Sequence, residues 1–317
     1  MDALADDASS PFLLHHPSPM NRRHFLRQSG AVAAVSALLG PGAARAFAAA
    51  RTAPIPAELG IQLYTLRDIL PGDVNGVLET LARVGIGEVE TAGYADRDPA
   101  DFAAVLDTLG LTTPSAHQLV SEVVASSESM ANAGLPDFET ALETIATVGH
   151  DYFVIPWLPP DARPDRDGYL RLADLLNGFG ERAKAAGVQL AYHNHDFEFD
   201  TFGTDRPAYF DFVERLDPEL VTLELDIFWS TVAGHDAVDL FEMYPGRFPL
   251  WHVKDGTGTG EEMTQSVVGD GIVDWPRVFA ASETAGLKHA FLEADFPPDG
   301  DGLAFARESV AYVESLR

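Results

Sequence analysis

The chain has 317 residues, of which 46% are hydrophobic, and carries a formal net charge of −28 at pH 7. This apolar fraction suffices for a buried core and excludes a largely disordered chain, while the acidity disfavours binding to nucleic acid, itself a polyanion. Cysteine is absent, which excludes disulfides, thiolate-bound zinc, iron–sulfur clusters and thiol nucleophiles, so any metal must be held by His, Asp and Glu.

The first predicted element in chain order is an export signal in residues 1–50. Arg22 and Arg23 precede an apolar run at 31–39, and an alanine-rich segment follows at 43–50. This order is typical of a cleavable secretory signal, and the apolar run is too short to span a bilayer. The paired arginines resemble the signal that the twin-arginine export machinery reads. We therefore expect a periplasmic or extracellular mature protein without a membrane segment; an uncleaved membrane anchor is the alternative.

From residue 51 to residue 317, β-rich runs alternate with amphipathic segments, which indicates βα units around a parallel sheet. Several of the amphipathic segments end in glycine, as helices commonly do. Eight strands are predicted, at 60–64, 88–91, 113–117, 152–156, 189–195, 222–227, 250–254 and 290–294. Helices are predicted between them, among them 74–84, 138–148, 169–186 and 275–285.

Eight such units can close into a barrel or remain an open, doubly wound sheet. An open sheet that binds nucleotides carries a glycine-rich loop after its first strand, whereas here the first strand runs into residues 65–68 without a glycine cluster. The glycines of 256–260 come late and alone, and we interpret them as a flexible loop rather than a nucleotide site. The prediction is a single-domain α/β protein, a (β/α)8 TIM barrel over 51–317.

Ionisable, polar and aromatic residues collect at the ends of the predicted strands, where a (β/α)8 barrel builds its active site. Strands disfavour charged residues, and a buried charge is costly unless it is paired or bound to a metal. Packing alone therefore does not explain the following set: Gln62, Tyr64, Glu88, Glu90, His117, Trp157, His193, Asn194, His195, Glu224, Asp226, His252, Lys254, Asp255, Glu293 and Asp295.

The spacing within the strands suggests a metal site. Side chains two positions apart point the same way, so His193 and His195 can both face the barrel interior. Asp226, His252 and Glu293 come from three successive strands and can converge on one divalent cation, with His193 as the fourth ligand.

Some of these residues have an equally simple structural interpretation. A single histidine such as His117 is commonly a hydrogen-bonded residue of the core or surface. Glu88 and Glu224 are expected to pair with arginines on the outer layer of the barrel rather than to join the site. What favours a site is the appearance of such residues at almost every strand end.

Seven segments resemble the sugar phosphate isomerase/epimerase family of the xylose-isomerase-like TIM barrel superfamily. They lie at 60–68, 89–94, 192–199, 225–229, 245–255, 268–275 and 292–295, and the resemblance covers roughly residues 59–316. It implies a divalent metal, most often manganese, with cobalt, magnesium, zinc and iron as alternatives. Asp226, His252 and Glu293 match three of the family's ligand positions. At the fourth, epimerases of the superfamily usually carry a glutamate that is both ligand and base, and this chain has His193.

That departure argues against a ketose 3-epimerase. What remains is a metal-dependent isomerase/epimerase or dehydratase/lyase that removes a proton next to a carbonyl of a sugar, keto-sugar or inositol derivative. We expect His195 or Glu293 to move the proton and Lys254 to stabilise the negative charge that develops. Glu90 or Glu198 is expected to supply the missing carboxylate.

The carbohydrate substrate is expected to be oriented by five residues near the strand ends: Gln62, Tyr64, His117, Trp157 and Asn194. Two other functions stay open. One is a non-catalytic, exported sugar-binding barrel, which would not need so many ionisable groups around a metal. The other is a hydrolase like the apurinic-site endonucleases, which the acidic surface disfavours. A homo-oligomer is compatible with the sequence.

Overall fold

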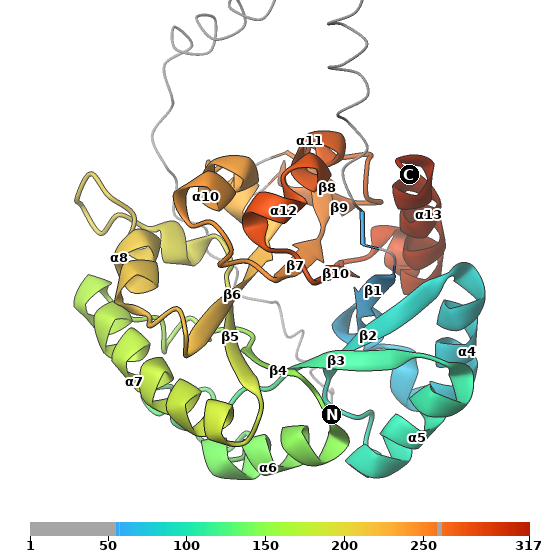
Figure 1. The fold of residues 1–317 in the computed structure, drawn as a ribbon, viewed down its shortest axis with the longest axis horizontal. Helices are drawn as coiled ribbons and strands as arrows, with labels where there is room; N and C mark the ends of the chain where they lie inside the picture. The colour runs from blue at the N-terminus through green and yellow to red at the C-terminus, as the bar shows by residue number, and fades with distance from the viewer. Residues whose placement is uncertain (1–54, 57, 259–261) are drawn as a thin grey trace, which may run out of the picture. The chain divides into compact units, whose positions relative to one another are not determined.

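The computed structural model describes residues 55–56, 58–258 and 262–317 (Figure 1). The described parts of 55–257 and of 264–317 belong to one compact unit. The predicted export signal at 1–50 lies outside the described residues. None of the described helices combines the length and the apolar character that a membrane span requires.

Eight parallel strands close into a barrel in the order β1-β10-β7-β6-β5-β4-β3-β2. They are β1 (Leu59–Gln62), β2 (Ile86–Ala92), β3 (Thr112–His117), β4 (Tyr152–Ile155), β5 (Gln189–His193), β6 (Val221–Asp226), β7 (Leu250–Val253) and β10 (His289–Leu292). Each overlaps a strand predicted from the sequence, so the predicted (β/α)8 architecture is confirmed. A separate antiparallel pair consists of β8 (Asp255–Thr257) and β9 (Thr264–Ser266). Gly256, predicted to lie in a flexible loop, is part of this pair instead.

The helices surround the strands in Figure 1. They are α4 (Val74–Val84), α5 (Pro99–Leu109), α6 (Phe138–Val148), α7 (Arg166–Ala185), α8 (Ala208–Arg215), α9 (Ile227–Val232), α10 (Ala237–Met243), α11 (Trp275–Ala280), α12 (Ser282–Ala285) and α13 (Gly302–Ser315). The predicted bounds of α4 and α6 are matched, whereas the helix predicted at 275–285 is broken at Ala281 into α11 and α12.

Aspartates begin most of these helices. Each accepts a hydrogen bond from a backbone N–H of the first turn, which satisfies a group that the helix itself leaves unpaired. The capping residues are Asp73, Asp98, Asp137, Asp165, Asp226, Asp236, Asp274 and Asp301. Part of the acidic composition is therefore used to start helices.

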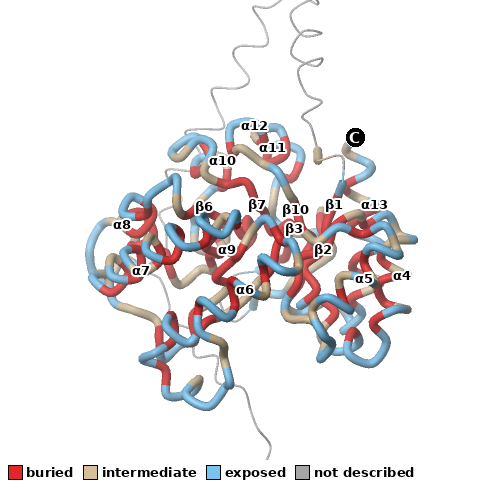
Figure 2. Tube along the Cα trace, turned by 60° about the horizontal axis from the view of Figure 1, so that its bottom comes forward, coloured by how far each residue is buried: buried red, intermediate tan, exposed pale blue. Residues whose placement is uncertain are grey.

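The barrel interior has an apolar layer, and polar residues lie at either end of the strands. Buried residues run along the strands and one face of helices such as α4 and α5 (Figure 2). Inside the barrel, an apolar layer consists of Val154, Ala191, Leu250 and Phe291. Gly60 faces this layer, and a Cβ atom at Gly60 would overlap the Phe291 ring.

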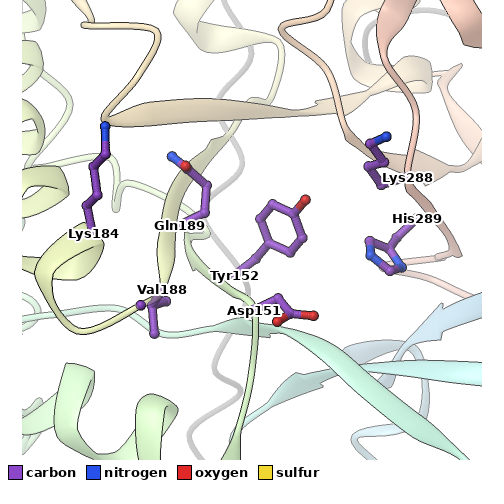
Figure 3. Close-up of a pocket in the computed structure, with 8 residues that line it drawn as sticks. Asp151, Tyr152, Lys184, Val188, Gln189, Lys288 and His289 are labelled. Atoms are coloured by element: carbon purple, nitrogen blue, oxygen red, sulfur yellow. The ribbon is translucent and has the colours of Figure 1, made fainter.

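A hollow of about 490 Å³ lies at the amino ends of β4, β5 and β10, on one side of the apolar layer (Figure 3). It is lined by Asp151, Tyr152, Lys184, Gly187, Val188, Gln189, Lys288 and His289. None of the residues predicted to form the site lines it. Those residues lie at the carboxyl ends of the strands.

Candidate functional site

The carboxyl ends of four neighbouring strands bring together the four predicted metal ligands. His193 ends β5, Asp226 ends β6, His252 lies near the end of β7, and Glu293 directly follows β10. Their side chains point inward because parallel strands alternate with a period of two, and all four are buried. One nitrogen or oxygen atom of each lies within 4.8 Å of the others. We call these four residues the quartet.

Three further polar residues, which we call the trio, contact the quartet from β2, β3 and β6: Glu90, His117 and Glu224. The Glu224 carboxylate oxygen Oε2 lies 2.6 Å from His117 Nε2, 3.0 Å from His193 Nδ1 and 3.3 Å from His252 Nε2. The Glu90 oxygen Oε2 lies 2.7 Å from His252 Nε2 and 3.1 Å from His117 Nε2. The quartet and the trio form one continuous network.

The prediction that Glu88 and Glu224 pair with arginines on the outer layer is wrong. Glu224 is fully buried and contacts three histidines, and the Glu88 carboxylate lies 2.9 Å from His289 Nδ1. The reason is the two-residue period of a strand. Glu224 shares the inward face of β6 with Asp226, and Glu88 shares that of β2 with Glu90.

The buried carboxylates raise the pKa of two histidines. Burial alone would lower the pKa of His117, but Glu90 and Glu224 outweigh this effect and raise it to about 9. Burial likewise opposes protonation of His252, yet Glu224 and Glu293 hold its pKa well above the ordinary value. These two rings therefore favour the charged form in the absence of another cation.

Two other histidines are held neutral. Burial and the neighbouring cationic groups, His252 first among them, hold the pKa of His193 well below its ordinary value. Burial also lowers the pKa of His195 to about 3. A neutral imidazole keeps the lone pair that a metal ligand or a general base needs.

Lys254 lies among three carboxylates. Its ammonium nitrogen is 2.9 Å from Asp226 Oδ2, 2.5 Å from Glu293 Oε2 and 2.8 Å from Asp295 Oδ2. Burial would lower the pKa of this lysine, but the three acids hold it well above the ordinary value. Lys254 therefore stays charged and supplies a fixed positive centre beside the quartet.

The pKa values of the two acids of the quartet shift in opposite directions. Burial raises the pKa of Asp226 to about 6, although Lys254 acts in the opposite direction. Burial would also raise the pKa of Glu293, but His252 and Lys254 outweigh it and bring the pKa below the ordinary value. Asp226 Oδ1 accepts the backbone N–H of Trp229. Among the described residues, its Oδ2 accepts no hydrogen bond, although Lys254 pairs with it ionically.

His195 lies at the edge of the quartet, between aromatic rings. Its ring stacks on Phe197 and Trp229, with centroid distances of 5.4 and 5.9 Å, and meets the His193 ring edge-on. Within the described part of the chain, its Nδ1 has no hydrogen-bond partner. The residue predicted to move a proton is thus neutral, half-buried and free at one nitrogen.

The two candidates for an extra carboxylate occupy different surroundings. Glu90 belongs to the trio. Glu198 instead accepts hydrogen bonds from the Tyr192 hydroxyl and the His195 backbone N–H, both at 2.8 Å. Burial raises the pKa of Glu198 to about 8. Of the two, Glu90 contacts histidine rings, those of His117 and His252, whereas Glu198 contacts only the backbone of His195.

The predicted substrate-binding residues are not all equally free to bind. Gln62 is buried, donates to Glu90 Oε2 and accepts the Tyr64 N–H, while Asn194 joins β5 to the backbone of Asp226. Tyr64 is 44% exposed at the strand ends, beneath the Arg67 guanidinium. Trp157 follows β4 and is half-buried. His117 belongs to the trio. Their roles toward a substrate stay predictions.

Three residues that sequence reasoning did not select also join the site. The Ser115 hydroxyl donates to Glu90 Oε1, and Gln265 on β9 donates to Asp295. Trp229 stacks on His195, and the Lys254 ammonium lies 5.6 Å from its ring centroid. The sequence spacing could have indicated two of them as site residues, since Ser115 lies two residues before His117 and Trp229 lies one helical turn beyond Asp226.

Comparison with known proteins gives a family and several relatives. The model of the family described as xylose isomerase-like TIM barrel matches residues 78–316. An inosose dehydratase from Geobacillus kaustophilus (strain HTA426) is 25% identical over 264 residues, which cover 71% of this chain and 82% of that protein.

Solved structures of the same fold include a sugar phosphate isomerase/epimerase from Parabacteroides distasonis ATCC 8503. It has a TM-score of 0.67 and 25% identity, and the match covers 83% of this chain and 96% of that one. A structure of the IOLI protein with a binding zinc atom has a TM-score of 0.64 and 18% identity, covering 81% of this chain and 98% of that one.

Proposed function

This chain belongs to the xylose isomerase-like TIM barrel family, and we propose that it is a divalent-metal-dependent dehydratase that acts on a cyclic keto-polyol or keto-sugar. The observation that carries the proposal is the buried quartet, which has a histidine where an epimerase would need a second carboxylate. The similarity to an inosose dehydratase over 71% of the chain supports the substrate class.

The quartet fits a divalent cation by its donor set. His193 and His252 offer imidazole nitrogens, and Asp226 and Glu293 offer carboxylate oxygens, a mixture that suits manganese, iron, cobalt or zinc. Asp226 Oδ2, which accepts no hydrogen bond among the described residues and is paired ionically with Lys254, is the oxygen of this residue that would bind the cation. The zinc atom bound in the IOLI structure, which has the same fold, supports a divalent metal. We propose manganese as the native metal. When bound, the metal would supply Lewis-acid polarisation of the substrate carbonyl.

The protein residues would carry out the proton transfer. Neutral His195 would remove the proton next to the carbonyl and pass that proton to the hydroxyl that leaves from the neighbouring carbon. One water is lost, and no oxidant or reductant is required. The Lys254 ammonium would stabilise negative charge on oxygen, while the Trp229 ring would pack against the C–H face of the substrate.

Metal content tests the site. The purified protein should retain roughly one metal ion per chain, and Asp226→Ala and His252→Ala should lose it because each removes a ligand from a four-residue set. His289→Ala, a histidine at the opposite end of the barrel, should keep it. Full metal content in both ligand variants would refute the assignment.

Turnover tests the reaction. The stripped protein, reloaded with manganese, cobalt, zinc, magnesium or iron, should convert an inosose or a 3-keto sugar into a dehydrated product that absorbs in the ultraviolet. Proton NMR in D2O distinguishes dehydration from the alternative functions. An isomerised or epimerised substrate without loss of water would show an isomerase, and binding without any turnover would show a sugar-binding protein.

We also propose that the protein is exported by the twin-arginine machinery through residues 1–50, on the strength of Arg22 and Arg23 followed by a short apolar run. In fractionated cells the mature chain should be outside the cytoplasm. Replacing both arginines by lysine should retain it inside. Unchanged export of that variant would point to another route.

A further inference from the structure

Both histidines of the quartet have an acidic residue near each ring nitrogen. His252 Nδ1 lies 2.7 Å from Glu293, within the quartet, and its Nε2 lies 2.7 Å from Glu90, in the trio. His193 Nε2 lies 3.9 Å from Asp226, within the quartet, and its Nδ1 lies 3.0 Å from Glu224, in the trio. Each ring therefore joins one carboxylate of the quartet to one of the trio, but the two rings are oriented oppositely.

A neutral imidazole has one lone pair and one N–H. A ring that gives its lone pair to a metal must therefore carry its proton on the other nitrogen. A carboxylate that accepts this proton fixes both the tautomer and the orientation of the ring. Glu224 and Glu90 lie where such an acceptor is needed, and neither is part of the quartet.

We propose that the trio positions the metal ligands, and that the two histidines coordinate through different nitrogens. Glu224 accepts the Nδ1–H of His193, which presents Nε2 to the metal. Glu90 accepts the Nε2–H of His252, which presents Nδ1. Glu90 and Glu224 are thus positioning residues. This inference rests on the proposed metal site in the quartet.

The surroundings of the two carboxylates agree with this role. Glu90 is held in place by Gln62, which donates to Oε2, and by Ser115, which donates to Oε1. His117 Nε2 bridges the two carboxylates, at 2.6 Å from Glu224 and 3.1 Å from Glu90. These contacts leave each carboxylate oriented toward its histidine of the quartet.

A second metal site is the competing interpretation of the same residues. His117, His193, Glu224 and His252 also offer atoms within 4.8 Å of one another. Filling both sites would require His193 and His252 each to bind one metal ion through each ring nitrogen, and therefore each to lose its remaining N–H proton. Glu90 and Glu224 can accept hydrogen bonds from these N–H groups without such a deprotonation, so one metal ion per chain is expected.

The nitrogen assignment can be measured directly. In the zinc-loaded, ¹⁵N-labelled protein, long-range ¹H–¹⁵N correlation spectra distinguish a metal-bound nitrogen from a protonated one in each ring. We expect His193 to be bound through Nε2 and His252 through Nδ1. Coordination of both rings through the same type of nitrogen, or two zinc ions per chain, would overturn the proposal.

Variants test the positioning by affinity. Glu224→Ala and Glu90→Ala should each weaken zinc binding roughly 10- to 100-fold, the usual effect of losing the outer partner of a metal-bound histidine. Glu224→Gln should recover part of the loss, because its amide oxygen still accepts the His193 N–H, and it also serves if the alanine variant does not fold. Glu88→Ala, two residues earlier on β2 and paired with His289 rather than with a histidine of the quartet, is the matched control and should change the affinity less than twofold.

Competition titration against a chelator gives these affinities for the full-length mature protein, with the fold of each variant checked by circular dichroism. Wild-type affinity in both alanine variants would overturn the positioning role while leaving the quartet intact. No zinc binding by the wild type, or unchanged binding by Asp226→Ala, would instead refute the proposed metal site itself.

Discussion

Two glutamates lie two positions apart on β2, and each pairs with a histidine inside the barrel. Glu88 faces the amino ends, where its one histidine partner, His289, is 20% exposed beside the hollow of Figure 3. Glu90 faces the carboxyl ends, and both it and His252 are fully buried. Glu90 also receives hydrogen bonds from Gln62 and Ser115.

The two pairs differ in the number of partners that each charged group contacts. At the amino ends, water and a single partner can satisfy the charge. At the carboxyl ends, each charge depends on several buried neighbours, so that a change at one residue alters the others. This asymmetry agrees with the general division of (β/α)8 barrels, in which the carboxyl ends carry chemistry and the amino ends carry stability.

The largest expected effect is on stability when the buried glutamate is removed. Glu90→Leu should lower the free energy of unfolding by about 3–5 kcal/mol, because it removes one of the buried carboxylates that balance the charge of His117 and His252. Glu88→Leu should cost less, about 1 kcal/mol, because its partner His289 is 20% exposed and can be hydrated when the glutamate is removed. Urea unfolding in the presence of a chelator measures both. Equal losses would show that the glutamates at the carboxyl and amino ends of the barrel contribute equally to stability.

The sequence alone predicted the barrel because its strands are β-rich runs separated by helical patterns. It also predicted the quartet, since His193, Asp226, His252 and Glu293 lie near the ends of four successive predicted strands. A parallel strand must end where its neighbours end, so residues at strand ends meet without any further information.

The trio was predicted only in part, for a physical reason. The sequence around Glu224 does alternate, with polar Thr222, Glu224 and Asp226 on one face of β6 and apolar residues on the other. In a parallel barrel both faces of a strand are buried, so this alternation does not by itself show which face points into the barrel. Its spacing from Asp226 was the one signal. The partners of a buried acid come from distant strands, as with Glu90 and His252, and no local pattern specifies them.

The next largest effect should appear in the pH dependence of stability. At the carboxyl ends Glu198 differs from Glu90, because its hydrogen-bond donors are uncharged. Burial raises its pKa from 4.5 to about 8. Between these values the unfolded chain releases the proton and the folded chain keeps it, so stability should fall as pH rises, by up to about 1.4 kcal/mol per pH unit.

Glu198→Gln should remove this contribution, because the amide has no proton to lose. The free energy of unfolding, measured with urea from pH 5 to pH 8 in a chelator, should fall less steeply for the variant than for the wild type. Glu181→Gln, on the exposed surface of α7, is the matched control and should keep the wild-type slope. Parallel curves for wild type and Glu198→Gln would mean that Glu198 is ionised in the folded protein.

The smallest effect is expected at the amino ends. Lys184 and Lys288 flank the hollow of Figure 3, and Lys184 makes an exposed ion pair with Glu219 at 3.6 Å. Such pairs contribute between about 0 and 1 kcal/mol. The apolar layer of Val154, Ala191, Leu250 and Phe291 separates the hollow from the quartet.

Replacing both lysines by methionine should therefore leave metal content unchanged and kcat/KM within about twofold of wild type, since the charges removed act through water and across the apolar layer. Metal analysis and the ultraviolet assay of dehydration measure the two quantities. A tenfold loss of activity with full metal content would give the amino ends a part in catalysis. The asymmetry that Glu88 and Glu90 illustrate would then be one of burial and not of function.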